Sequence, residues 1–299
     1  MSTPFDFFPV TVARVTDVTP SFRRFTFTGD TLDCFADPGW DQRIKVVLPL
    51  RDRGFEELPR GEDWFLRWRG LPADRQHPFR TYTVRGVRQR AREVDVDMVV
   101  HPVSGPASAW IADAGVGDEA VLLGPTTDHA GDYGGVDFLP PARTESFLLV
   151  GDETAAPAIA VILEQLPATA RGIAVLEVPV TDDLGYLPWH PGIDVRVYPR
   201  EQGRHGEALV REARRAAIEL APPGVSQEVE EVDVDSELLW ETPRSDDGTA
   251  ALQRTRLYAW LAGEAGAIKE LRRFLVGDLG IDRRSVAFMG YWRLGKAEL

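Results

Sequence analysis

The stretch SFLLVGDETAAPAIAVILEQL, residues 146–166, begins with a continuous apolar run that closes on Gly151 and Asp152. A short apolar run bounded in this way is typical of a strand that is buried on both faces. The residues that follow, 153–166, predict a helix. A buried strand followed directly by a helix is the unit from which α/β domains with parallel sheets are built.

The rest of the C-terminal half repeats this alternation. We expect a helix at 265–280, because Ile268, Leu271, Leu275 and Leu279 recur at steps of three and four residues and so share one buried face. Further segments complete a parallel sheet covered by helices on both sides, with strands at 171–180, 193–199, 256–264 and 285–293 and another helix at 207–220.

One segment interrupts this pattern. Residues 221–250 carry nine acidic residues against one arginine. Runs of like charge are usually solvated, so we expect an exposed excursion before the next strand. With this insertion, the expected α/β domain spans residues 145–299.

The N-terminal half has a different texture. Its short segments are rich in Val, Thr, Ile and Phe and are separated by Gly, Pro and Asp, which predicts an antiparallel β-barrel at residues 1–128. A short helix is expected at 104–115, with Ser104 or a neighbour as cap and Pro106 in the first turn. The six expected strands are 10–18, 22–29, 43–50, 80–87, 93–101 and 118–125.

Composition narrows the class of protein. A chain of 299 residues divides by default into two domains. A net charge of −13 argues against nucleic acid or an anionic membrane as the main partner. The N-terminus lacks a signal-peptide pattern and no apolar run approaches the roughly 18 residues of a membrane span, so we expect a cytoplasmic protein without membrane insertion. One cysteine, Cys34, and five scattered histidines predict no resident metal.

The segment RTYTVR, Arg80 to Arg85, carries the most chemistry. Alternation along a strand sends Arg80 and Tyr82 to one face and Thr81 and Thr83 to the other. An arginine beside an aromatic ring and two hydroxyls can bind a phosphate, stack on a planar ring and hydrogen-bond its edge. A decorated edge strand is an equally good interpretation of these residues alone.

A family resemblance separates the two interpretations. RTYTVR resembles the flavin-binding R-x-Y-[ST] motif of the ferredoxin-reductase superfamily, in the form found in siderophore-interacting proteins, the ferric-siderophore reductases. Four more segments resemble that family in the same order, namely 97–125 with its GPA helix start, LLVGDETAAPAI, WLAGEAGAIKELRRFL and GYWRLGKAE. The resemblance implies an FAD-binding β-barrel followed by an NAD(P)H-binding α/β domain.

The resemblance also implies the FAD contacts. Arg80 is expected to neutralise the diphosphate, Tyr82 to pack against the isoalloxazine, and Thr81 and Thr83 to offer hydroxyls, with Thr83 bonding the ring. Independently of the family, the free N–H groups of a helix start suit a phosphate. The remaining expected contacts are His101, the helix start Gly105, Pro106, Ala107 and Ser108, and Trp292, for which a buried role between the domains is the alternative.

The NAD(P)H site is expected where strands of the α/β domain end. Gly151, Asp152, Glu153 and Thr154 follow the first strand, at the edge where open parallel sheets bind ligands, although Asp152 or Thr154 can serve as a plain helix cap. The second element, 262–264, resembles the family's AGE segment, comprising Ala262, Gly263 and Glu264. Cofactor choice stays open, because Arg200 and Arg204 suit the extra phosphate of NADPH whereas Glu177 suits NADH.

The expected substrate is a ferric siderophore, with the flavin rather than a protein side chain carrying the chemistry. Only three of the 34 basic residues are lysines, and Lys45 and Lys296 fall with Arg293 at the pocket that the resemblance implies. Solvated surface lysines are the alternative. The sequence thus predicts a monomeric reductase that passes electrons from NADPH or NADH through FAD to siderophore-bound Fe(III) and releases Fe(II). A general flavin or electron-transfer reductase and a non-catalytic siderophore-binding protein remain alternatives.

Overall fold

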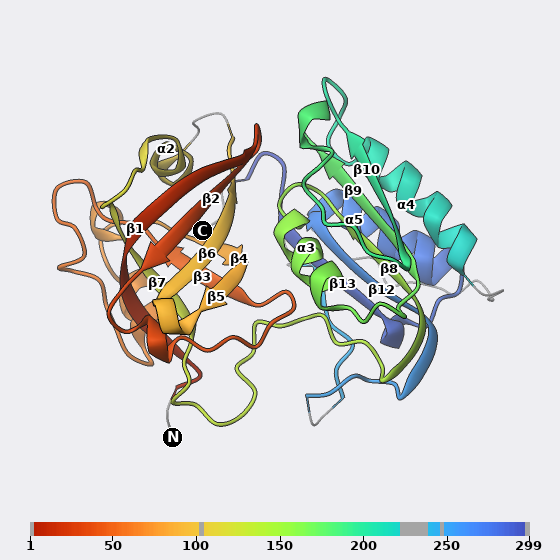
Figure 1. Cartoon of the computed structure of the whole chain (residues 1–299), viewed down its shortest axis with the longest axis horizontal. Helices are drawn as coiled ribbons and strands as arrows, with labels where there is room; N and C mark the ends of the chain where they lie inside the picture. Colours follow the sequence, from red (N-terminus) through yellow and green to blue (C-terminus); the bar gives the residue numbers. More distant parts are fainter. Residues whose placement is uncertain (1–2, 102–104, 222–238, 246–247, 297–299) are drawn as a thin grey trace. The chain divides into compact units, whose positions relative to one another are not determined.

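The computed structural model describes residues 3–101, 105–221, 239–245 and 248–296. Contacts divide the chain into two compact units, Met1–Val136 and Asp137–Leu299. The first consists mainly of β-strands and the second alternates strands with helices (Figure 1). Short 3₁₀ turns lie at Leu32–Cys34, Ala73–Arg75, Gln89–Ala91, Thr181–Asp183 and Arg283–Ser285.

The first unit is built on a seven-stranded antiparallel sheet with the order β4-β3-β7-β1-β2-β6-β5 (Figure 1). Its apolar side chains alternate with polar ones, so that Phe25 and Phe27 of β2 lie in a buried core while Arg24 points outward. The strands are β1 (Phe5–Thr19), β2 (Phe22–Thr28), β3 (Arg43–Val47), β4 (Phe79–Thr83), β5 (Gly86–Arg88), β6 (Glu93–Val99) and β7 (Glu119–Pro125).

The expected antiparallel barrel is confirmed, but the predicted strand 80–87 is two strands. The chain changes partner at Val84 and Arg85, because β4 pairs with β3 whereas β5 pairs with β6. Among the described residues no ladder joins β4 to β5 or β6, and the Arg85 N–H bridges this opening by donating to the Asp95 carbonyl oxygen at 2.9 Å. The sheet is therefore a barrel closed by single contacts rather than by a full ladder.

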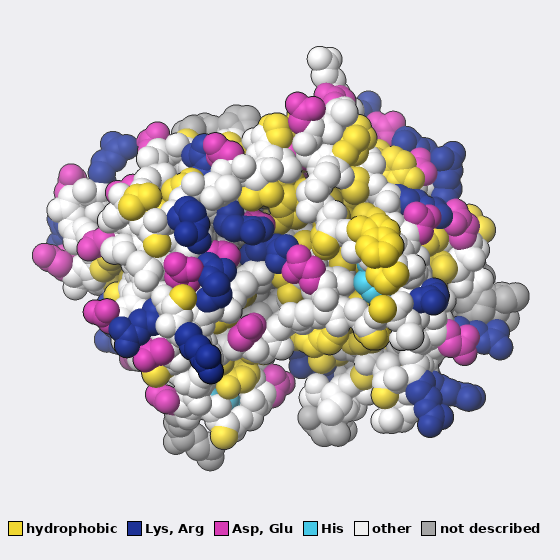
Figure 2. Space-filling model, in the orientation of Figure 1, with side chains coloured by type: hydrophobic (Ala, Val, Ile, Leu, Met, Phe, Trp, Pro, Cys, Tyr) yellow, Lys and Arg dark blue, Asp and Glu magenta, His cyan; other side chains and the backbone are white. Residues whose placement is uncertain are grey.

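The outer face of β2, β5 and β6 is covered by ion pairs. Arg24 binds Asp97 through two hydrogen bonds of 2.6 and 2.8 Å, and Arg88 binds Asp95 in the same fork at 2.7 and 2.8 Å. Lys and Arg side chains accordingly lie among Asp and Glu side chains on the visible face of this unit (Figure 2). Planar guanidinium groups suit such paired contacts, so this face is ordered although it is polar.

Two helices pack on the barrel. The predicted short helix is confirmed as α2 (Pro106–Asp113), whose Trp110 ring packs at a tilt against the Phe25 ring with centroids 5.1 Å apart. Its proposed cap Ser104 lies outside the described residues. The other helix, α1 (Trp64–Arg69), was not predicted, since six residues are too few to display a helical period. Trp64 and Trp68 of α1 cover an apolar cluster on the outside of β3, β4 and β7.

The second unit is an open sheet with the order β10-β9-β8-β12-β13-β11, parallel except for the edge strand β11. The expected parallel α/β arrangement is therefore confirmed. Chain order reverses between β8 and β12, which makes the end of these two strands the topological switch point. The strands are β8 (Arg143–Gly151), β9 (Gly172–Val178), β10 (Ile193–Pro199), β11 (Trp240–Glu241), β12 (Arg254–Glu264) and β13 (Val286–Trp292).

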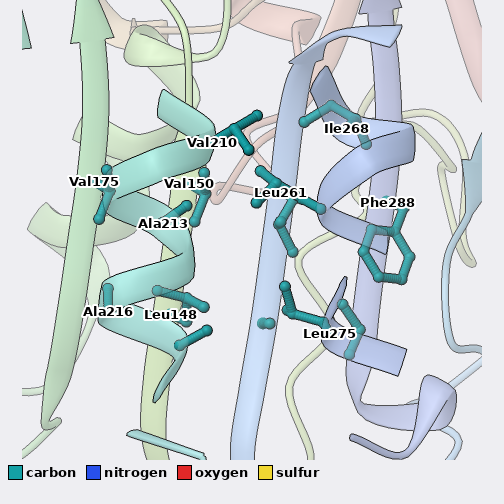
Figure 3. Close-up of a cluster of buried hydrophobic side chains, with 14 of the residues drawn as sticks. Leu148, Val150, Val175, Val210, Ala213, Ala216, Leu261, Ile268, Leu275 and Phe288 are labelled. Carbon is teal, nitrogen blue, oxygen red and sulfur yellow. The ribbon is translucent and has the colours of Figure 1, made fainter. Parts of the chain in front are cut away.

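Helix α3 (Ala156–Gln165) covers one face of this sheet, and α4 (Glu207–Leu220) and α5 (Ala265–Arg272) cover the other (Figure 1). Apolar side chains of α4 and α5 interlock with those of β8, β9, β12 and β13 (Figure 3). The predicted face of the last helix is confirmed, with Ile268, Leu271 and Leu275 fully buried, although a π-helical turn, Arg273–Asp278, replaces its last part. Each fully buried side chain of this size stabilises the fold by about 1.5–3 kcal/mol.

The expectation of a wholly solvated segment at 221–250 is wrong for its described part. Leu239 is buried, and the next two residues form β11, which pairs with β13. Trp240 stacks on Tyr291 with ring centroids 5.6 Å apart, and Glu241 accepts a hydrogen bond from buried Arg272 at 2.7 Å. The apolar residues within the acidic run therefore outweigh its charge and return the chain to the sheet.

Candidate functional site

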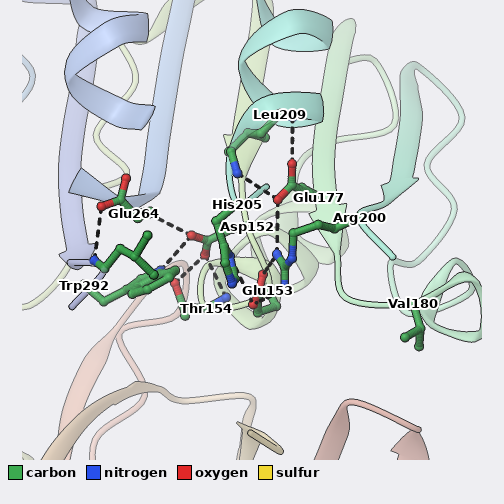
Figure 4. A network of polar contacts seen from close by, with 12 residues as sticks. Asp152, Glu153, Thr154, Glu177, Val180, Arg200, His205, Leu209, Glu264 and Trp292 are labelled. Carbon is green, nitrogen blue, oxygen red and sulfur yellow. Dashed lines mark hydrogen bonds and ion pairs between the residues drawn. The ribbon is translucent and has the colours of Figure 1, made fainter. Parts of the chain in front are cut away.

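A single buried carboxylate joins three strand ends at the switch point of the second unit. Asp152 follows β8, and its Oδ1 accepts hydrogen bonds from the Thr154 N–H at 2.9 Å and the Thr154 hydroxyl at 2.5 Å. Its Oδ2 accepts from the Glu264 N–H at the end of β12, at 2.7 Å, and from the Trp292 indole Nε1–H at the end of β13, at 2.8 Å. Four donors converge on this side chain (Figure 4).

Opposing effects act on the pKa of Asp152. Burial, followed by the nearby Glu153 carboxylate, raises the pKa of Asp152 to about 7, while the donors Thr154 and Trp292 oppose the rise. Burial disfavours the charged form and hydrogen bonds to the anion favour it, so the two effects compete at this site. Asp152 is consequently easier to protonate than an exposed aspartate.

The same carboxylate leaves no room for a side chain at position 263, which is glycine. Its φ of +149° is one that side-chain-bearing residues rarely adopt, and a Cβ built there would lie 2.6 Å from Asp152 Oδ2. The next residue, Glu264, begins α5 by accepting a hydrogen bond from the Ala267 N–H at 2.9 Å. Segments 151–154 and 262–264, which the sequence analysis singled out separately, thus form one structure, with Ala262 fully buried beneath it.

A second buried network lies beside the first. Arg200 donates to both carboxylate oxygens of Glu153, at 2.9 and 3.0 Å, and to Glu177 at 3.1 Å. Glu177 also accepts the N–H groups of Gly206 and Leu209 at 3.0 Å, which caps the start of α4 (Figure 4). Both carboxylates are fully buried and satisfied inside the fold.

This network corrects the sequence-based interpretation of Arg200 and Glu177. The sequence suggests Arg200 as a selector of NADPH and Glu177 as a selector of NADH. In the structure the two side chains bind each other. A buried charge is stable only when it is paired, and the pairing leaves neither group available to a nucleotide.

A cavity of about 840 Å³ opens between the start of α4 and the start of α5. Arg204, His205 and Arg211 line its α4 side and Glu264 lines its α5 side. The His205 ring meets the Trp292 ring edge-on, with centroids 5.1 Å apart. The exposed Arg204 side chain enters no ion pair with the part of the chain that the structure describes.

In the first unit, β4 carries the predicted flavin motif. Its ladder with β3 pairs Arg80 with Val46 and Tyr82 with Ile44, on the face that packs toward the barrel core. Arg80 and Tyr82 are half-buried, Thr81 is exposed and Thr83 is buried. His101 is exposed and lies just after the end of β6.

The predicted phosphate-binding helix start is well formed. Gly105 is extended at the N-cap of α2, and Ser108 Oγ lies 3.0 Å from both its nitrogen and its carbonyl oxygen, accepting from the first and donating to the second. Pro106 is exposed at the first turn and Ala107 is buried against the barrel core. A half-buried arginine and a helix start are what a dinucleotide diphosphate requires, so these residues fit FAD.

The three predicted substrate residues belong to different units. Lys45 of β3 pairs with Thr81, donates to its hydroxyl at 3.3 Å and lies 4.9 Å from the centre of the Phe79 ring. Lys45 therefore shares a face with Thr81 rather than with Arg80 and Tyr82. Arg293 and Lys296 lie in the second unit, in the turn after β13.

No group of three or more His, Cys, Asp or Glu side chains among the described residues is arranged to hold a metal ion. Within the same residues, none of the helices combines the length and the apolar character that crossing a membrane requires.

The two units together have the fold of FAD-dependent reductases that use a pyridine nucleotide. A ferredoxin NADP⁺ reductase from Neisseria gonorrhoeae, solved with bound FAD and NADP, superposes with a TM-score of 0.52 over 92% of each chain, at 15% identity. At that identity the likeness establishes the fold. Because residues 11–129 also match an FAD-binding domain, the class is that of FAD-binding oxidoreductases.

Closer comparisons give the family. Residues 11–129 match the siderophore-interacting FAD-binding domain and residues 144–295 match the siderophore-interacting protein family. Ferric vibriobactin reductase ViuB of Vibrio cholerae serotype O1 is 29% identical over 94% of this chain and 87% of its own. A siderophore utilization protein from T. fusca superposes with a TM-score of 0.73 at 27% identity, over 100% of this chain and 97% of that chain. The chain belongs to the siderophore-interacting protein family.

Sequence reasoning missed the partners within the site. It identified Asp152 and Trp292 but assigned them to different cofactors, whereas their side chains are bonded to each other. It also missed His205. The available signal that these charges lie at one sheet edge was their position near the ends of the expected strands 171–180 and 193–199, before a helix start at 207.

Replacing Gly263 should disturb the fold and the site together. We expect Gly263→Ala to lower the free energy of unfolding by about 2 kcal/mol, because the new Cβ meets Asp152 and the backbone is strained. Urea unfolding followed by circular dichroism measures this. Gly185→Ala is the matched control, since its Cβ meets nothing within 4 Å. Equal stabilities of the two variants would contradict the role given to Gly263.

Proposed function

We propose that this protein is a flavin-dependent ferric-siderophore reductase that takes electrons from NADPH. The main supporting observation is that segments 151–154 and 262–264 meet at the switch point. The first unit of the same chain matches the family's FAD-binding domain. One hydride carries two electrons, so each nucleotide oxidised reduces two ferric ions to ferrous ions and leaves one proton. Oxygen-rich chelators hold the softer Fe(II) less tightly, and the iron is then released.

The FAD site is assigned to the first unit. Arg80, with the helix start at Gly105 to Ser108, would hold the diphosphate, and Tyr82 would pack against the isoalloxazine ring. The hydroxyls of Thr81 and Thr83, and the ring of His101, would supply polar contacts. Bound FAD supplies the chemistry that links a two-electron donor to one-electron acceptors. The protein residues bind and orient, and none needs to act as an acid or base.

The pyridine nucleotide is assigned to the carboxyl edge of the second unit. The turn from Gly151 to Thr154 precedes α3 at the carboxyl edge of the sheet, where open parallel sheets bind ligands. Gly263 and Glu264 would border the same site. Trp292, half-buried at the end of β13, would border the same nucleotide site.

NADPH is proposed because the groups that would select NADH are engaged within the fold. Glu177, whose carboxylate could otherwise bind a ribose hydroxyl, caps α4 and neutralises Arg200. Arg204 is exposed at the mouth of the cavity beside the start of α4. An unpaired guanidinium beside a helix start suits the additional phosphate of NADPH.

The substrate is proposed to be an anionic ferric siderophore that meets Lys45, with Arg293 and Lys296 as further contacts. The Lys45 ammonium group is held over the Phe79 ring and beside the Thr81 hydroxyl. A compact, oriented cation attracts a chelate of negative charge without displacing its iron. We also propose that the enzyme works as a monomer in the cytoplasm.

The proposed activity is tested by anaerobic reduction of a ferric siderophore, with a ferrous-iron chelator reporting release. We expect colour only when FAD-loaded protein and NADPH are both present, at about two ferrous ions per nucleotide oxidised. Rapid reduction of soluble dyes without iron release would favour a general electron-transfer reductase. Chelate binding without nucleotide oxidation would favour a siderophore-binding protein.

Substitution of Lys45 tests the substrate contact. We expect Lys45→Ala to lower kcat/KM for the ferric siderophore about tenfold, with unchanged FAD content and unchanged dye reduction, because only the chelate loses a charge partner. Lys269→Ala, on α5 of the second unit, is the matched control. Siderophore kinetics that are the same in both variants would remove Lys45 from the substrate site.

Substitution of Arg204 tests the choice of nucleotide. We expect Arg204→Ala to raise KM for NADPH about tenfold and to leave KM for NADH unchanged, because only NADPH carries the phosphate that Arg204 would bind. Arg215→Ala, which lies on α4 and is paired with Glu212, controls for the general loss of positive charge. An equal rise for both nucleotides would contradict the assignment.

A further inference from the structure

Trp292 is held by a side chain rather than only by its strand. The ladder between β12 and β13 pairs Glu264 with Trp292 and so fixes the Trp292 backbone. The chain beyond it is fixed by the Leu294 N–H, which donates to Glu264 Oε1 at 3.3 Å. Neither contact sets the direction of the indole ring. The hydrogen bond from its Nε1–H to Asp152 Oδ2, at 2.8 Å, does.

The Asp152 carboxylate, which accepts this hydrogen bond, is held rigidly because both of its oxygens have other donors. Asp152 is buried, its Oδ1 is bonded twice by Thr154, and its Oδ2 also receives the Glu264 N–H. Gly263 leaves the space that this carboxylate fills. A hydrogen bond to an ionised carboxylate is stronger than one to a neutral oxygen, so the indole has one preferred orientation.

The ring held in this way stands at the edge of the nucleotide-binding region. Its half-buried face borders His205, which lines the cavity between α4 and α5. Its other end reaches the turn between β8 and α3 through Asp152 (Figure 4). Trp292 therefore lies between the two parts of the switch-point edge that a dinucleotide would span.

We infer that Asp152 is a positioning residue, which fixes the Trp292 indole as one wall of the pyridine-nucleotide site. This inference rests on the proposed function, because it assumes that a pyridine nucleotide occupies this edge. Asp152 acts through Trp292 and not by touching the nucleotide. The consequence is that loss of either partner should weaken nucleotide binding by the same amount.

The charged surroundings make this contact sensitive to pH. Glu153 faces Asp152 from the same turn and is itself paired with Arg200, while Glu264 and His205 approach from β12 and from the turn before α4. As the pH falls through about 7, Asp152 becomes protonated and loses the charge that strengthens the indole hydrogen bond. The hydrogen bond that holds the Trp292 indole should therefore be strongest in alkaline solution.

The test uses ¹⁵N-labelled, FAD-loaded protein and a double-mutant cycle of Asp152→Asn and Trp292→Phe. Trp292→Phe identifies the Trp292 indole N–H resonance by its disappearance, and that resonance should shift in Asp152→Asn. The Kd for NADP⁺, measured by calorimetry, should rise about fivefold in each single variant and no further in the double variant. Trp240→Phe is the matched control and should leave this Kd unchanged.

An unmoved Trp292 resonance in Asp152→Asn, or single effects that multiply in the double variant, would overturn the inference. If Asp152→Asn fails to fold, a pH titration of the unaltered protein decides. A common midpoint for the Trp292 resonance and the NADP⁺ affinity supports the inference, and a resonance that titrates while the NADP⁺ affinity stays constant refutes the nucleotide wall. If the resonance responds but no pyridine nucleotide binds, the hydrogen bond between Asp152 and Trp292 is supported. That result would reject both the role of Trp292 as a wall of the nucleotide site and the proposed function.

Discussion

A carboxylate is buried stably only where several hydrogen-bond donors replace the water around it, and this requirement organises the second unit. Asp152 meets it with donors from three places in the chain, namely its own turn, the end of β12 and the end of β13. Strand ends that would otherwise be separate loops are thereby fixed relative to one another. The neighbouring Glu153 obeys the same rule with Arg200, so the edge where ligands bind in such sheets is held by paired charges rather than by apolar packing.

The fold followed from local patterns because those patterns report burial directly. The apolar run before Gly151 is typical of a strand covered on both faces, and the spacing of Ile268, Leu271 and Leu275 is typical of one side of a helix. Antiparallel strands of the first unit alternate apolar and polar residues, as at Phe25 and Phe27. Helix α4 spans the predicted residues, since its amphipathic period runs unbroken from its first residue to its last.

The rest depended on contacts that no local pattern records. Nothing in the sequence near Glu177 says that its carboxylate will meet Arg200 and the start of α4, because these are brought together only by the order of strands in the sheet. The split of the strand 80–87 is similar, since a change of ladder partner leaves no mark on residue preferences. Strand β11 was hidden by the acid residues around it, and α1 was too short to show a period. The family resemblance identified which residues matter, but it did not say which side chains bind each other.

The cap that Glu177 provides for α4 has an evolutionary consequence. In many nucleotide-binding sheets the acidic residue at this strand end discriminates between cofactors, and changing it changes preference. In this protein that position is part of the internal framework, and its loss would leave Arg200 charged and unpaired in the interior. If Arg204 binds the additional phosphate as proposed, discrimination lies instead in a surface turn, 203–205, which contributes little to the core. Under that assignment, a substitution at position 204 would change cofactor preference without a cost in folding, so stability and specificity could be selected separately.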